Sequence, residues 1–395
     1  MSGRDRGFAG LSRSDDYSGY GRLRGPRRDE ATHLRRGRRR GEAVSPRSGA
    51  VIHKSLFGRS YDAWMALAER HQWLRWAAKW GLSLVSLLSG IVTLIIFRRG
   101  TDHFPWILGN LLLLWVGGVV FAHLRQALEV RNRRLIGVAM DFTLQSLHHE
   151  LLLFLMPIYY ASTTLSSRNV CFLLLHLAVT LLTAIDPWYR ATILRYPWAA
   201  HALFAFGLFA SLNVGLPLVQ VRSAWALIFS PVLSLLALTP AIRRGFAQSW
   251  RNAALAAALG GSLAASIIWS VRDWIPPAPL YLSAATFARS VERLEAMEPI
   301  RRVSQADLQA WGSLACFTAV SAPAGLREQI YHVWRKDGIP FARIALSPIK
   351  GGRPGGYRTY SQRSDLGSDS GGRWTVDVLT AQGQLIGGVR LVVTR

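Results

Sequence analysis

A stripe of ionisable and amide side chains lies near the middle of the chain. Asp141, Gln145, His148 and His149 fall at i, i+4, i+7 and i+8, so a helix brings them to one face, and Glu150 lies just beyond. Neutral imidazole beside carboxylate can bind a divalent metal or relay protons. The HEXXH zinc motif is missing, so we predict no metal site. Two interpretations stay open: a working intramembrane cluster, or a stripe that reaches headgroups and water.

A second polar and aromatic group lies near the C-terminus, and we predict that it forms a ligand-binding surface: His332, Trp334, Arg335, Arg353, Tyr357, Arg358, Tyr360 and Ser361. A serine and a histidine raise the possibility of nucleophilic catalysis, but the sequence places no acid beside them and contains no nucleophile elbow. We therefore predict no catalytic residues and no cofactor. The loop KGGRPGGYR lacks phosphate-loop spacing. It is either an anion cradle or a mobile hairpin connection.

The elements that position the first group are long apolar segments. Six of them contain no Asp, Glu, Lys or Arg and approach the roughly 20 residues that cross ~30 Å of hydrocarbon: 80–97, 104–122, 169–185, 197–221, 223–242 and 252–271. A seventh segment, 142–165, carries the polar stripe. Tryptophans gather near the segment ends, as is typical of the headgroup layer. We predict a membrane all-α bundle of about seven spans over 80–271.

Arginine placement sets the predicted orientation. With seven spans and a cytoplasmic N-terminus, the inner loops hold nine arginines and the outer loops four. If 142–165 does not span, the later loops change sides and the asymmetry disappears. We therefore expect a multi-pass protein of the bacterial inner membrane with a periplasmic C-terminal domain.

The net charge of the chain is +24, and its basic residues are densest near the N-terminus. Residues 1–59 are rich in Arg, Gly and Ser, which predicts a disordered basic cytoplasmic tail that contacts anionic lipid. We exclude nucleic acid as a partner, because topology control and lipid attraction account for this charge. Residues 60–79 have the pattern of an interfacial amphipathic helix. Cys171 and Cys316 lie in different regions and predict no disulfide framework.

The C-terminal region changes to a period of two. We expect a Pro-rich linker with short helices over 272–312, including a helix at 283–298, and a β-domain over 313–395. Tight hairpins are predicted at Asp337-Gly338 and Gln382-Gly383. The pattern favours an immunoglobulin-like, all-β sandwich, with six predicted strands at 314–320, 329–335, 342–346, 356–362, 373–380 and 385–394.

Several motifs resemble an uncharacterised bacterial family: AVSAPAGL, YHVWR at 331–335, GYRTYS at 356–361, GRWTVDV at 372–378 and the upstream run HHELLLFLMPIYYAST. The family is attached to multi-span membrane proteins and is known as a domain of unknown function. The resemblance implies architecture and an inner-membrane location, and no activity.

Two functions compete. In the first, the spans present the β-domain as a binding module for an envelope ligand or protein partner. In the second, the protein is a transporter or intramembrane enzyme that uses the cluster around 141–150, and the β-domain is regulatory. We favour the first, because ligands commonly bind on sandwich loops and the spans hold few ionisable residues.

Overall fold

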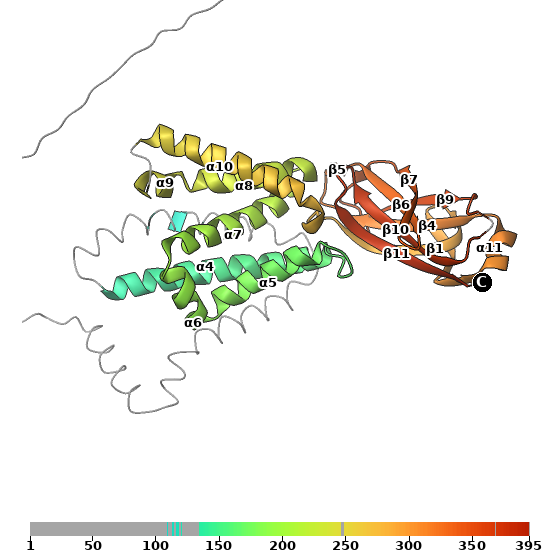
Figure 1. Cartoon of the computed structure of the whole chain (residues 1–395), viewed down its shortest axis with the longest axis horizontal. Helices are drawn as coiled ribbons and strands as arrows, with labels where there is room; N and C mark the ends of the chain where they lie inside the picture. Colours follow the sequence, from blue (N-terminus) through green and yellow to red (C-terminus); the bar gives the residue numbers. More distant parts are fainter. Residues whose placement is uncertain are drawn as a thin grey trace, which may run out of the picture. The chain divides into compact units, whose positions relative to one another are not determined.

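A computed structural model of the chain describes residues 134–245, 249–367 and 369–394, together with positions 109, 113, 116, 117 and 120. The predicted tail at 1–59, the interfacial helix at 60–79 and the span at 80–97 lie outside the described residues. So does the span at 104–122, apart from those five positions. Within the described part, helices come first and β-strands follow (Figure 1).

Among the described residues, seven α-helices and two helical turns form the first region. In chain order they are α4 (Arg134–Ala161), α5 (Val170–Ala184), α6 (Asp186–Tyr189), the π-helical η1 (Arg190–Leu194), α7 (Pro197–Leu218), α8 (Ser223–Ala237), α9 (Thr239–Gly245), α10 (Trp250–Ser270) and the 3₁₀ turn η2 (Arg272–Trp274).

Within the described part of the chain, fewer helices meet the requirements of a membrane span than the sequence predicts there. Among the described residues, α7 and α10 are long and apolar enough, and the count rises to four if two bent pairs each form one span. The bend is 96° between α5 and the α6–η1 segment, and 45° between α8 and α9. Pro187 and Pro240 lie just after these breaks, in the first turn of the next helix. Proline is favoured there, because it has no N–H to donate and a first-turn N–H has no partner within the helix. The polar stripe lowers the apolarity of α4, which is not among the candidates.

Helix α10 has small residues on its buried face and large apolar residues on its exposed face. Every fourth position is small and buried: Ala253, Ala257, Gly261 and Ala265. The opposite stripe is 57–64% exposed: Leu255, Leu259, Leu263 and Ile267. A Cβ at Gly261 would lie 2.8 Å from the Cα of Val232 in α8. The glycine therefore permits the backbones of α8 and α10 to approach closely.

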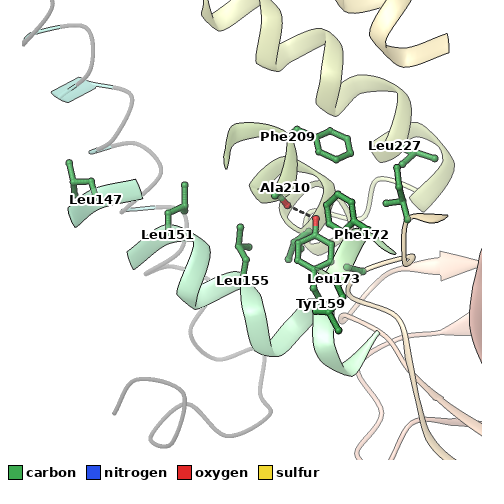
Figure 2. Packing of buried hydrophobic residues seen from close by; sticks show 12 residues of the cluster. Leu147, Leu151, Leu155, Tyr159, Phe172, Leu173, Phe209, Ala210 and Leu227 are labelled. Atoms are coloured by element: carbon green, nitrogen blue, oxygen red, sulfur yellow. Dashed lines mark hydrogen bonds between the residues drawn. The ribbon is translucent and has the colours of Figure 1, made fainter. Parts of the chain in front are cut away.

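The core of the helical region is built on one face of α4. Leu147, Leu151, Leu155 and Tyr159 recur every fourth residue and pack against side chains of α5 and α7 (Figure 2). The Tyr159 hydroxyl donates to the Ala210 carbonyl at 2.9 Å. Burial of a tyrosine hydroxyl is favourable only with such a partner.

The described residues of the second region contain eleven strands and one helix. They are β1 (Tyr281–Glu292), β2 (Glu295–Ile300), β3 (Arg302–Ser304), α11 (Gln305–Trp311), β4 (Leu314–Ser321), β5 (Arg327–Glu328), β6 (Ile330–Lys336), β7 (Ile339–Ala345), β8 (Ile349–Lys350), β9 (Tyr357–Arg363), β10 (Gly372–Thr380) and β11 (Leu385–Thr394). Ser304 caps α11, as the sequence predicts: its Oγ accepts from the Asp307 N–H at 3.0 Å.

Two sheets pack face to face. One has the strand order β2-β1-β4-β9 and the other β3-β11-β10-β6-β7, while β5 and β8 form a separate pair. Phe287 and Cys316 of the first sheet share a buried cluster with Trp334 and Trp374 of the second. The six predicted strands are all present; β11 has the predicted bounds and the other five have shifted ends. Asp337 and Gly338 both have positive φ, as the predicted two-residue hairpin requires.

The sandwich begins earlier than the sequence indicates. The predicted helix at 283–298 is wrong, because this segment forms β1 and the start of β2. Phe287, Val291 and Leu294 have helical spacing, but β1 pairs with β4 from Tyr281↔Ser321 to Ala288↔Ala315. Strand β4 is buried along nearly all of its length. The backbone groups of such a buried strand need hydrogen-bonded neighbour strands on both edges. This pairing outweighs the local helix propensity of the segment that forms β1.

Candidate functional site

The predicted C-terminal group is divided between the surface and the core. On the surface, Arg358 and Tyr360 alternate with the buried Thr359 and Ser361 along β9. Tyr360 is 40% exposed. Next to this strand, the Arg353 guanidinium lies 4.9 Å from the centre of the Tyr357 ring. We call the exposed Arg353, Arg358 and Tyr360, together with the half-buried Tyr357 under Arg353, the β9 surface.

An ion pair extends across the sheet that carries the β9 surface. The Nη1 of Arg358 donates to the Oε1 of Glu295 at 3.1 Å. Glu295 belongs to β2 and Arg358 to β9, and these are the two edge strands of the sheet. The β1–β2 hairpin must therefore curve across the outer face of β4 to reach β9. Glu295 and the β9 surface form one composite exposed surface.

The serine and the histidine meet inside the sandwich. The Nδ1 of His332 lies 2.7 Å from the Oγ of Ser361, and its Nε2 lies 3.0 Å from the Oγ1 of Thr318. The Nε1–H of Trp334 donates to the same Ser361 Oγ at 2.9 Å. All four side chains are buried. Burial also lowers the pKa of His332 to about 4, so the imidazole is neutral near pH 7.

This four-residue core network joins the two sheets. His332 and Trp334 come from β6, while Thr318 and Ser361 come from β4 and β9 of the opposite sheet. The neighbouring Cys316 is fully buried, and burial raises the pKa of its thiol. A hydroxyl and an imidazole enclosed in this way satisfy each other's hydrogen bonds and do not face solvent. The geometry is that of a buried structural network.

Arg335 lies apart from both groups. Its Nε donates to the Oδ2 of Asp377 at 2.8 Å, between the neighbouring strands β6 and β10. Both side chains are partly exposed on the second sheet. Arg335 was predicted to contribute to the ligand-binding surface. It lies on a different sheet from the β9 surface.

The glycine loop is fastened to the sandwich. Gly351 N–H donates to the Leu326 carbonyl, and Gly352 N–H donates to the Ala322 carbonyl, both at 3.0 Å. Further along, the Ser283 hydroxyl donates to the Gly355 carbonyl at 2.7 Å. The amide groups that a backbone anion cradle would use at 351 and 352 are thus occupied by protein carbonyls. The alternative of a mobile connection also finds no support in this hydrogen bonding.

The polar stripe on α4 meets the break between α5 and α6. Gln145 Nε2 donates to the Oδ1 of Asp186 at 2.7 Å and to the Thr183 carbonyl at 3.0 Å. His149 Nδ1 lies 3.3 Å from the Thr183 Oγ1. These four side chains are buried and form the α4–α6 polar cluster.

The other members of the stripe lie at its margin. His148 Nδ1 lies 2.7 Å from the Leu144 carbonyl of its own helix, Asp141 is partly buried and Glu150 is exposed. No group of three or more His, Cys, Asp or Glu side chains that could hold a metal occurs among the described residues.

Two acidic residues that make contacts between elements, Asp186 and Glu328, were not among the residues predicted from the sequence. Asp186 interrupts an apolar run and precedes a proline, a signal that was available in the sequence. Glu328 is buried, and its Oε2 accepts from the Ser223 N–H at 3.0 Å, which joins β5 to α8. Nothing near Glu328 in the sequence indicates this contact, because its partner lies 105 residues away.

The fold thus defines a protein with an apolar helical bundle followed by a β-sandwich. The model of a family of unknown function, DUF5924, matches residues 57–315, and the chain belongs to this family. A second family model, the protein of unknown function DUF2914, matches residues 327–393 within the sandwich. No curated protein and no solved structure matches the chain. The resemblance to an uncharacterised family is confirmed to this extent.

Proposed function

We propose that this protein is a membrane-anchored binding module whose helices hold the sandwich at the membrane surface. The observation that carries the proposal is the exposed stripe of α10, Leu255, Leu259, Leu263 and Ile267, opposite a buried stripe of small residues. Water would penalise such an arrangement, whereas lipid accommodates large apolar side chains and small residues allow close helix packing. The seven-span count and the immunoglobulin-like topology remain parts of this proposal.

The contacts between the helices and the sandwich support one orientation. The sandwich hydrogen bonds with three connections: Asn169 after α4, Ser223 at the start of α8, and Ile275 after α10. The arginines in or beside these connections are Arg168, Arg222 and Arg272. The connections at the other helix ends carry Arg190, Arg195, Arg243, Arg244 and Arg251. By the positive-inside rule, the second set is cytoplasmic and the sandwich is periplasmic, in a bacterial inner membrane.

The β9 surface is the binding face in this proposal. Among the sequence candidates, His332, Trp334 and Ser361 are committed to the core, whereas Arg353, Arg358 and Tyr360 are exposed and Tyr357 is half-buried against the sandwich core. Arginine and tyrosine combine a charged or polar tip with a large apolar contact area, which suits recognition of an envelope ligand. The basic N-terminal tail, outside the described residues, would add attraction to anionic lipid.

Co-sedimentation of the purified full-length protein with peptidoglycan fragments tests this function. We expect the wild type to sediment and the double variant Arg358→Ala/Tyr360→Ala to lose most of this binding. Arg343→Ala/Tyr331→Ala is a matched control, because Arg343 stacks on Tyr331 at 4.1 Å on the other sheet. Equal sedimentation of the β9 variant and the control would contradict the proposed face.

A second function is favoured by the α4–α6 polar cluster. A buried carboxylate at a helix break, hydrogen-bonded by Gln145, is typical of ion pathways through membranes. In proteoliposomes containing a pH-sensitive dye, proton flux that falls in Asp186→Asn but persists in the exposed-site control Glu150→Gln would support transport. Flux that is absent in the wild type, or equal in both variants, would argue against it.

A further inference from the structure

A basic pocket lies where the α7–α8 connection meets the β5–β8 pair. This cavity of about 470 Å³ is lined by Gln220, Arg222, Gly325, Leu326, Arg327, Lys350 and Gly351. Three of these residues are cationic and none is acidic. Its lining shares no residue with the β9 surface or with the α4–α6 polar cluster.

Two of the cations are cross-strand neighbours. Arg327 of β5 and Lys350 of β8 are directly opposite in the antiparallel register. Like charges on directly opposite strand residues repel each other and destabilise the strand pair. Among the described residues, neither side chain has a hydrogen bond or an ion pair. The arrangement therefore lacks its counter-charge within the described protein.

The third cation faces the same cavity from the helical region. Arg222 immediately precedes α8, whose first N–H, that of Ser223, is occupied by the Glu328 carboxylate. Glu328 is itself buried and follows Arg327 on β5, so the alternation of the strand directs it away from the pocket-lining side chain. One buried carboxylate near three cations leaves a local positive excess.

The pocket walls are closely packed at two glycines, against the Gln220 side chain at Gly325 and against backbone at Gly351. A Cβ at Gly325, which has a φ of +80°, would lie 2.5 Å from the Gln220 Nε2. A Cβ at Gly351 would overlap the Pro323 carbonyl oxygen. The side chains of Leu326 and Ile349, adjacent to the two cations, are fully buried and anchor both strands. The cations thus project from a fixed framework, which lowers the entropy cost of binding.

We propose that the basic pocket binds a phosphate group through Arg222, Arg327 and Lys350. Guanidinium and ammonium groups are the side-chain groups that bind phosphate most strongly. A bound phosphate would also give Arg327 and Lys350 a shared negative partner. The group belongs either to a soluble phosphate compound or to a lipid headgroup. Trp225 and Phe229 stack at 5.5 Å on exposed α8 positions one and two turns beyond Arg222, a pattern consistent with the headgroup layer.

The test uses the full-length protein in neutral detergent, with inorganic phosphate as the first probe. Thermal unfolding is followed against phosphate concentration at constant ionic strength maintained with chloride. We expect saturable stabilisation of the wild type and at least a tenfold loss of apparent affinity in Arg327→Gln/Lys350→Gln. Arg301→Gln/Arg302→Gln, exposed residues at β3, removes the same charge and should keep the response.

Arg327→Glu keeps the test decisive if the neutral variant does not fold. It places a carboxylate opposite Lys350, so we expect a higher unfolding temperature without phosphate and no further gain with it. A phosphate response that persists in both pocket variants, or that disappears equally in the β3 control, would overturn the proposal.

The lipid source is tested in nanodiscs by native mass spectrometry. Nanodiscs of phosphatidylcholine are compared with nanodiscs that also contain phosphatidylglycerol. Retention of phosphatidylglycerol by the wild type and the β3 control, but not by the pocket variants, assigns a headgroup. A phosphate response without this difference assigns a soluble compound. The absence of both responses overturns the site.

Discussion

The Glu328 carboxylate accepts a hydrogen bond from the backbone N–H of Ser223 at 3.0 Å, so a strand of the sandwich is bonded to the first residue of α8. A helix N-terminus favours a negative group, because its first N–H groups have no partner within the helix. Burial nevertheless raises the pKa of Glu328, and this effect exceeds the opposing effects of the Ser223 hydrogen bonds and of Arg222.

This relationship predicts a pH dependence. Since the folded-state pKa of Glu328 exceeds its ordinary value of 4.5, the contribution of this group is fully present below that value and is lost as the pH rises through the folded pKa. The wild type should therefore lose stability relative to Glu328→Gln between pH 4 and neutrality. Urea unfolding in detergent at several pH values measures the difference, and a constant difference would contradict the prediction.

Ser361→Ala should destabilise the sandwich. It removes the acceptor of the Trp334 N–H and a partner of His332, and each buried group left unsatisfied costs about 1–3 kcal/mol. Urea unfolding gives the magnitude. Ser290→Ala, at a partly exposed position of β1, is the control and should change little. A fluorophosphonate probe should leave Ser361 unlabelled, and labelling there would show that the core network is open to solvent.

Gly261→Ala should weaken the helical region. Its Cβ would lie 2.8 Å from the Val232 backbone, and overpacking of this kind costs about 1–3 kcal/mol. Gly260→Ala is a close control, since its Cβ would meet only the end of the Leu235 side chain at 3.3 Å. Alanine favours helix by roughly 1 kcal/mol over glycine, so the control should be neutral or stabilising. Thermal unfolding that ranks the two variants in the opposite order would refute close α8–α10 packing.

Arg358→Ala should separate binding from stability. Both side chains of the Arg358–Glu295 pair are exposed, and exposed ion pairs contribute roughly 0–1 kcal/mol to the free energy of unfolding. We expect an unfolding midpoint close to that of the wild type together with weaker peptidoglycan binding. A large loss of stability would mean that the arched β1–β2 hairpin depends on this contact.

Much of the sandwich was predictable because its strands have regular alternation. Trp374, Val376 and Val378 are buried while Thr375 and Asp377 are partly exposed, as the period of two requires. By contrast, β1 contains alanine, arginine and glutamate, which favour helix locally. Its strand identity is fixed by pairing with β4, a long-range contact that local patterns do not contain.

The candidate sites were less predictable than the fold. Alternation placed His332 and Trp334 on one face of β6 but did not reveal that Ser361 of β9 lies opposite them in the other sheet. Likewise, the helical spacing of Gln145 and His149 was correct, while their partners Thr183 and Asp186 come from another helix pair. Spacing within one element is readable in sequence, whereas contacts between elements depend on packing.

The side of the membrane on which the sandwich lies tests the central claim most directly. Alkaline phosphatase and green fluorescent protein, each fused after Arg395 in a bacterial host, report the location of the C-terminus, and fusions after Arg244 report the opposite helix ends. For a periplasmic sandwich, we expect phosphatase activity without fluorescence at Arg395, and fluorescence without phosphatase activity at Arg244. Fluorescence at Arg395 would contradict this location.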